Sequence, residues 1–167
     1  MANYWTNYSF VIDKLTDAQL DWWEKKLEAL GELHDTDGYD PKDLDENGDP
    51  KDGAQTLYGI EDWGNPDSSF TIERHAHQVW CNSNDNEGGN VDGMIQVIQE
   101  YLAEMDPKRI VSYQWCGTCS KPRLDAYCGG AVAISKDRVL SKGSSALEDE
   151  FVERLKKSLS KKKKGKK

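Results

Sequence analysis

The apolar residues of this 167-residue chain change their spacing several times, and the order of these spacings constrains the fold more than any other feature. Segments rich in aromatic and β-branched residues predict strands at 4–15, 56–63, 69–75, 78–83, 109–115 and 124–135, with an edge strand at 138–140. Apolar residues three and four apart predict helices at 17–30, 91–105 and about 144–159. This order favours the α+β class, with helices packed on one face of a mainly antiparallel sheet.

The first predicted helix has recognisable ends. Thr16 followed by Gln19 three residues later is a capping box, and Gly31 is predicted to end the helix. Trp23 lies on the apolar stripe of this helix, whereas Trp22 lies one residue off it. We therefore expect Trp22 to be exposed, and exposed tryptophan often anchors a protein interface.

The charges are distributed very unevenly along the chain. Eight of the 22 Lys and Arg residues fall within 156–167, which contain no acid, and we expect this tail to be disordered. Residues 1–155 form one predicted domain with 14 basic and 30 acidic side chains, a net charge of −16. A body with this charge repels nucleic acid and attracts basic surfaces. The expected partner is a basic protein surface, and the tail is the one segment expected to contact nucleic acid.

The acidic residues are densest between residues 35 and 53, a stretch with almost no apolar residue, which predicts a long loop or a locally disordered insertion. The acidic residues predicted to bind a partner are Asp35, Asp37, Asp40, Asp43, Asp45, Glu46 and Asp49. Asp43, Asp45 and Asn47 also match the first ligand positions of a calcium loop, with Gly48 at its turn. The twelfth position is Ala54, where calcium requires a bidentate Glu, so a solvated loop is favoured and calcium remains an alternative.

The cysteines raise the question of a metal. Cys116 and Cys119 have the spacing of a zinc-ligand pair, which Cys81, Cys128, His75 or His77 could complete. The sequence offers no second tight pair, and we expect the CxxC itself in a hairpin loop. Reduced thiols and no cofactor are therefore favoured. Zinc remains the alternative, with these candidate ligands: Cys116, Cys119, Cys128, His75 and His77.

The stretch Trp115–Arg123 reads WCGTCSKPR, and the stretch Gly129–Val132 reads GGAV. Together they resemble a motif of uncharacterised small proteins encoded by phages, plasmids and bacteria. Two further segments fit the same group: residues 8–23 and 79–91. The chain departs from the motif at Cys116 and at Cys128, where the group tends to have glycine, and both departures weaken the zinc interpretation. The resemblance implies a setting in a mobile element or its host, and it implies no activity.

Within this motif, Lys121 and Arg123 form a small basic island that Pro122 stiffens. The island could hold an anion, or it could lock the hairpin through ion pairs. Lys121, Arg123, Cys119 and Trp22 complete the predicted binding residues.

No apolar run approaches the roughly 18 residues that span a bilayer, and the first residues lack the features of a secretory signal. We therefore expect a cytoplasmic protein of a bacterium or an infected cell, with no membrane partner. The leading hypothesis is an acidic interaction protein of a phage or other mobile element, or of its host. It would bind and inhibit a basic nucleic-acid-processing or defence protein in a counter-defence role, and DNA mimicry is the sharp form of this hypothesis.

Three alternatives remain. The first is an immunity protein that neutralises a basic toxin. The second is a metal- or cysteine-dependent enzyme in which His75 and His77, on one face of a strand, meet Cys119, with Lys121 and Arg123 in the same pocket. The sequence offers no third group to orient such a Cys–His pair, so a non-enzyme is favoured. The third is a structural or accessory phage protein.

Overall fold

The computed structural model describes residues 4–36, 38–58, 70–83, 89–119 and 128–164. Its six strands are β1 (Tyr4–Ile12), β2 (Phe70–Glu73), β3 (Gln78–Asn82), β4 (Val111–Cys119), β5 (Cys128–Ser135) and β6 (Arg138–Gly143). Its helices are α1 (Asp17–Asp35), α3 (Val91–Glu104) and α4 (Ser144–Lys164), with short 3-10 turns at Pro41–Asp43 and Arg74–Ala76.

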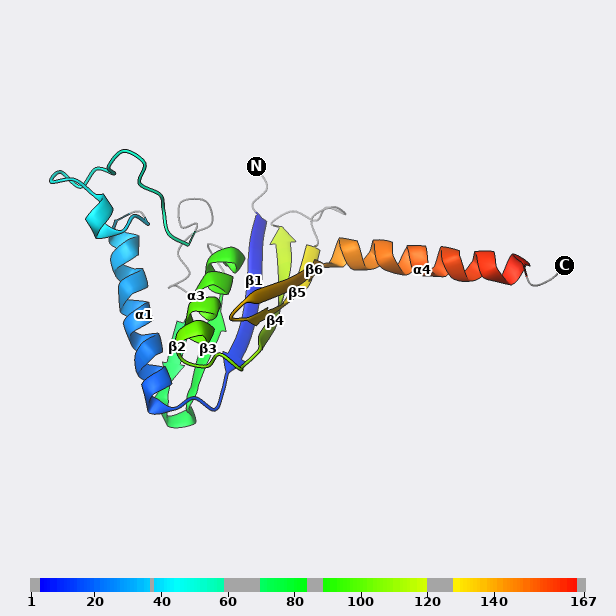
Figure 1. Ribbon diagram of the computed structural model, residues 1–167, viewed down its shortest axis with the longest axis horizontal. Helices are drawn as coiled ribbons and strands as arrows, with labels where there is room; N and C mark the ends of the chain where they lie inside the picture. Colours follow the sequence, from blue (N-terminus) through cyan, green and yellow to red (C-terminus); the bar gives the residue numbers. More distant parts are fainter. Residues whose placement is uncertain (1–3, 37, 59–69, 84–88, 120–127, 165–167) are drawn as a thin grey trace.

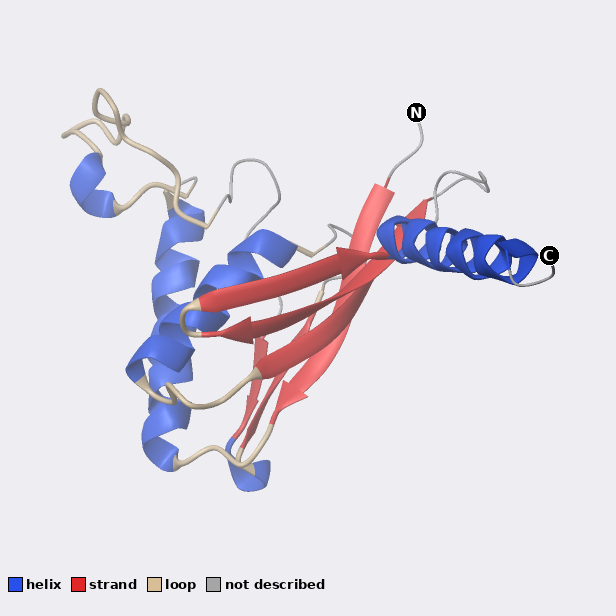
Figure 2. Ribbon diagram, turned by 45° about the vertical axis from the view of Figure 1, so that its right-hand side comes forward, coloured by secondary structure: helices blue, strands red, loops and turns tan. Residues whose placement is uncertain are grey.

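The strands form one antiparallel sheet in the order β2-β3-β1-β4-β5-β6. The segment from β1 to β4 has the connectivity of a split β-α-β unit, and β5 and β6 extend the sheet beyond β4. Helices α1 and α3 lie on the same side of the sheet (Figures 1 and 2). The predicted α+β class with helices on one face is confirmed.

The core lies between the sheet and the two helices, because the strands alternate apolar and polar residues. In β1, Tyr8 and Ile12 are buried, whereas Ser9 and Val11 are exposed. Trp23 of α1 and Tyr101 of α3 are completely buried, and their ring centroids are 5.2 Å apart. Burying a side chain of this size contributes roughly 2–3 kcal/mol, so this aromatic contact is a major link between the helices.

The start of α1 is confirmed, but its predicted end is wrong. The Thr16 N–H donates to Gln19 Oε1 at 2.8 Å, and the Gln19 N–H donates to Thr16 Oγ1 at 3.3 Å. The helix continues through Gly31 because one further turn buries Leu33. The chain reverses at Gly38, which has φ 87° and donates its N–H to the Leu33 carbonyl at 2.7 Å.

Several other expectations differ from the structure. Residues 56–58 of the predicted strand 56–63 lie in a loop, and the remainder falls outside the described residues. The CxxC lies inside β4 rather than in a hairpin loop, because β4 and β5 stay paired as far as Gly117 and Cys128. The tail expected to be disordered is helical over 156–164, since lysine is a good helix former and a helix already begun extends easily.

None of the helices in the described residues is both long enough and apolar enough to cross a bilayer.

Candidate functional site

The acidic segment forms a folded loop, residues 38–57, which we call the acidic loop. The Leu57 N–H donates to the Gly38 carbonyl at 2.9 Å and closes the loop at its base. An isolated antiparallel bridge pairs Leu44 with Pro50 in its middle. Compact loops whose ends lie close together are frequently functional. The prediction of a loop holds, and its backbone is tied by these contacts.

One acidic residue builds the tip of this loop. The Asp45 carboxylate accepts from the Asn47 N–H at 2.8 Å and from the Asp49 N–H at 3.0 Å, and Gly48 allows the turn with φ 86°. The backbone N–H groups of Asp49 and Asn47 favour the charged carboxylate and so hold the pKa of Asp45 below its usual value. Asp45 therefore has a structural role in shaping the turn.

Both lysines of the loop are occupied within it. Lys42 Nζ lies 2.5 Å from the Asp40 carboxylate, and this contact lowers the pKa of Asp40. Lys51 Nζ donates to the Lys42 carbonyl at 2.7 Å. Three other carboxylates, of Glu46, Asp49 and Asp52, are exposed and form no ion pair with any residue that the structure describes.

Tyr58 anchors the acidic loop between α1 and α3. Its hydroxyl donates to the Glu100 carboxylate at 2.9 Å and accepts from Lys26 Nζ at 3.1 Å. Lys26 and Glu100 also form an ion pair at 2.5 Å. Burial raises the pKa of Tyr58, so the phenol stays protonated. Burial alone would lower the pKa of Lys26, but its hydrogen bonds to Glu100 and Tyr58 raise it, so Lys26 stays a cation.

The backbone of Tyr58 is fixed as firmly as its side chain. Its carbonyl accepts from Asn90 Nδ2 at 2.7 Å, and its φ of 57° lies in the left-handed region. That region costs a residue with a side chain roughly 1–2 kcal/mol. Such strain persists only where the surroundings dictate the conformation, and it is common at functional sites. The anchor therefore holds the acidic loop in a defined place.

The acidic surface continues from the loop onto the end of α1, which lies beside it in Figure 1. Near the start of α1, Arg74 contacts Asp21 at 2.6 Å and forms a two-pronged contact with Glu24 at 2.5 and 2.7 Å. Glu28 and Glu32, on the later turns, are exposed. The negative charge is thus less compensated toward the acidic loop.

Trp22 does not have the exposed position that the sequence predicts. It is half-buried, with its ring 5.2 Å from Trp23 in an edge-to-face contact. Its Nε1 donates to the Glu104 carboxylate at 2.7 Å, and Lys26 Nζ lies 5.3 Å above its ring. These contacts place Trp22 in the packing between α1 and α3, so its burial weakens the case for an interface anchor.

The remaining predicted binding residues are scattered or lie outside the description. Asp35 is the last residue of α1, and Cys119 is the last residue of β4. Asp37, Lys121 and Arg123 fall outside the described residues. Asp43 is half-buried within the acidic loop.

The candidate zinc ligands whose side chains the structure describes do not form a cluster. Residues three apart in a strand belong to opposite faces and lie about 10 Å apart, so the CxxC of β4 cannot act as a ligand pair. Cys81 is completely buried in β3, and burial raises the pKa of its thiol well above the usual value. Among the described residues, no three His, Cys, Asp or Glu side chains are arranged to hold a metal ion.

The structure also separates the cysteine and histidines of the enzyme alternative. His75 lies in the 3-10 turn between β2 and β3, and His77 directly follows that turn, so they do not share one face of a strand, and both are exposed. Leu15, just beyond β1, donates to the His77 carbonyl, whereas Tyr4 at the other end of β1 pairs with Cys119. A strand of this length spans about 26 Å, so these groups cannot meet.

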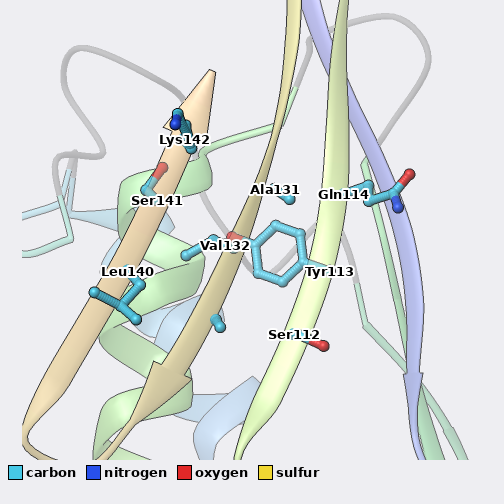
Figure 3. Close-up of a pocket in the computed structure, with 9 residues that line it drawn as sticks. Ser112, Tyr113, Gln114, Ala131, Val132, Leu140, Ser141 and Lys142 are labelled. Atoms are coloured by element: carbon cyan, nitrogen blue, oxygen red, sulfur yellow. The ribbon is translucent and has the colours of Figure 1, made fainter. Parts of the chain in front are cut away.

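The face of the sheet opposite α1 and α3 carries a feature that the sequence analysis missed. A hollow of about 560 Å³ lies over β4, β5 and β6, between Gln114 and Leu140, with Ala131 on its floor (Figure 3). Lys142 at its edge pairs with Glu150. The sequence signal that could have indicated this surface is the alternation of exposed and buried residues along β4 and β5. Apart from Lys142, the residues that line the hollow are uncharged.

Comparison of the chain with protein-family models, with curated proteins and with solved structures found no match.

Proposed function

We propose that this protein binds a basic protein and inhibits it, with the acidic loop as the principal contact surface. The observation that carries the proposal is the anchored loop itself. It presents the free carboxylates of Glu46, Asp49 and Asp52 on a backbone that Asp45 and Tyr58 hold in place.

The loop is already ordered before a partner binds, and this preorganisation favours binding. A partner that binds a loop already ordered does not have to supply the entropy of ordering it, which otherwise reduces affinity. Exposed carboxylates on a negative body also accelerate the encounter with a positive surface, and this acceleration falls as salt rises. The proposed complex therefore forms fast and depends on salt.

The class of partner follows from the same charge. A nucleic-acid-processing or defence protein presents a basic surface to the phosphate backbone, and an acidic loop could occupy it as DNA does. The resemblance to phage and plasmid proteins is consistent with such an inhibitor. A basic toxin offers a similar surface, so immunity against a toxin is the second form of the proposal, and the identity of the partner separates the two.

The test compares two variants of the intact chain as baits in bacterial lysate, at low and moderate salt, with captured proteins identified by mass spectrometry. The loop variant is E46Q/D49N/D52N. The control variant is D17N/D92N/D137N, which removes three exposed carboxylates from other elements and changes the net charge equally.

We expect the native chain and the control variant to capture one basic protein that is lost as salt rises, and the loop variant to capture much less of it. The captured protein, once purified, should lose activity when the native chain is added. Equal capture by both variants would exclude the loop as the contact surface. Recovery of the bait alone would contradict the proposed function.

A further inference from the structure

Helix α4 leaves the body of the protein and extends away from it (Figures 1 and 2). The contacts that hold it lie at its beginning, where Ser144 Oγ accepts from the Gly129 N–H at 3.1 Å and Glu150 pairs with Lys142. A helix of 21 residues is about 31 Å long, so most of α4 projects past these contacts.

The projecting helix exposes large apolar side chains. Phe151 is 56% exposed, Val152 42% and Leu147 37%. Leu155 and Leu159 continue the spacing of four residues that begins with Leu147 and Phe151. An apolar stripe on a helix is normally buried against another element, and the described part of this chain supplies none.

The charges of α4 change sign along its length. Its first half contains four acidic residues, Glu148, Asp149, Glu150 and Glu153, and its second half contains six lysines, 156, 157 and 161–164. This order suits the helix dipole, which favours acids at the start and bases at the end. The dipole does not explain the exposed phenyl ring of Phe151 halfway along the helix.

The projecting helix also carries its basic end away from the sheet of its own chain (Figure 1). Residues 144 and 161 are separated by about 26 Å of helix, several times the screening length of about 8 Å at physiological salt. The basic end therefore cannot neutralise the acidic body within one molecule. A second molecule lying alongside in the opposite direction can bring the two charges together.

We propose that α4 pairs with α4 of a second copy of this chain, in antiparallel orientation. In a pair whose two-fold axis passes at the level of Glu153, Phe151 lies level with Leu155 of the second copy. Leu147 then lies level with Leu159 of the second copy. The acidic residues Glu148, Asp149 and Glu150 then lie level with residues 156–158 of the second copy, two of which are lysines. A parallel pair would instead place acid beside acid and lysine beside lysine, so charge complementarity selects the antiparallel orientation.

The contact is small, since one helix on each side supplies it. Interfaces of this size belong to the weak, reversible class. We therefore expect monomer and dimer to exchange at micromolar concentrations rather than a permanent dimer.

The experiment is analytical ultracentrifugation of the full-length chain over concentrations from about 1 to about 100 μM. We expect the mass to rise from 18.9 kDa toward twice that value. Phe151→Ser should raise the dimer dissociation constant at least about tenfold. The matched control is Ile110→Ser, which removes a side chain that is 70% exposed elsewhere and should leave the constant unchanged. Circular dichroism confirms that both variants keep their helices.

The orientation is tested by exchanging charges. K156E/K157E alone and E148K/D149K alone should each weaken the dimer, and the combined variant should restore it, because these two segments of α4 lie beside each other only in an antiparallel pair. A native chain that stays monomeric over the whole range would overturn the proposal. A dimer that Phe151→Ser leaves intact would also overturn it, and a dimer that the charge exchange does not restore would exclude the antiparallel orientation.

Discussion

Tyr58 offers the sharpest test of how the acidic loop is held, because its side chain and its backbone make opposing contributions to stability. Its hydroxyl bonds to Glu100 and Lys26, while its backbone has the unfavourable φ of 57°. Substitution by Phe, Ala and Gly removes these contributions in different combinations. The three variants together separate the anchoring contacts from the backbone strain.

The magnitudes follow from the contacts of Tyr58. Tyr58→Phe loses hydrogen bonds of a half-buried hydroxyl, which costs about 1 kcal/mol. Tyr58→Ala also loses the packing of a half-buried ring, which adds about 1–1.5 kcal/mol and keeps the backbone strain. Tyr58→Gly loses the same ring, but glycine adopts positive φ freely. The Gly variant should therefore be about 1 kcal/mol more stable than the Ala variant. The expected order of stability is therefore native, Phe, Gly, Ala.

Urea unfolding followed by far-UV circular dichroism gives the free energies of the four proteins. Hydrogen exchange then reports the loop directly, through the Asp49 and Leu57 N–H groups, which donate within the loop. These amides should exchange faster in Tyr58→Ala while the amides of the sheet stay protected. An Ala variant more stable than the Gly variant would refute the strain argument. Unchanged exchange in the loop would refute the anchor.

Three further predictions concern other parts of the molecule. Gly93→Ala should destabilise the protein by about 1–3 kcal/mol in urea unfolding despite the better helix propensity of alanine, because its Cβ would lie 2.8 Å from the Tyr58 carbonyl. Asp45 titrates below the ordinary aspartate pKa of 3.8, so the turn is intact above that pH and loosens as pH falls through the lowered pKa. Carbon-detected NMR of the Asp45 carboxylate should show this lowered value, and an ordinary one would contradict its hydrogen bonds. Iodoacetamide should label the exposed Cys116 in the native protein but not the buried Cys81 until unfolding, and mass spectrometry would reveal the opposite pattern if the burial is wrong.

Much of the fold was predictable because many of its elements depend on local sequence. The capping box at Thr16 and the apolar stripe of α3 are patterns of adjacent turns, and both appear as expected. The end of α1 was not predictable from Gly31, because the extra turn is stabilised by burying Leu33 in the tertiary structure. The extent of β4 likewise depends on its partner β5, which lies later in the chain.

The candidate site was predictable only in composition. The density of acids between residues 35 and 53 indicated an acidic loop, and the loop is there. Its anchor was not visible, since Tyr58, Lys26 and Glu100 are far apart in the sequence and meet only in the folded chain. The CxxC wrongly suggested a pair of metal ligands, and the reason is also the tertiary structure. Its spacing suits a metal only where the chain turns, and strand pairing keeps this segment extended.

The two proposed surfaces lie at opposite ends of the molecule, with the acidic loop beyond α1 and the end of α4 on the far side of the sheet (Figure 1). The length of α4 alone, about 31 Å, exceeds the screening length of about 8 Å several times, so charges at one end act weakly on the other. E46Q/D49N/D52N should therefore reduce partner capture and leave the dimer constant unchanged. Phe151→Ser should do the reverse. If either variant moved both measurements, the surfaces would be coupled, and a dimer would have to bring α4 of one copy to the acidic loop of the other.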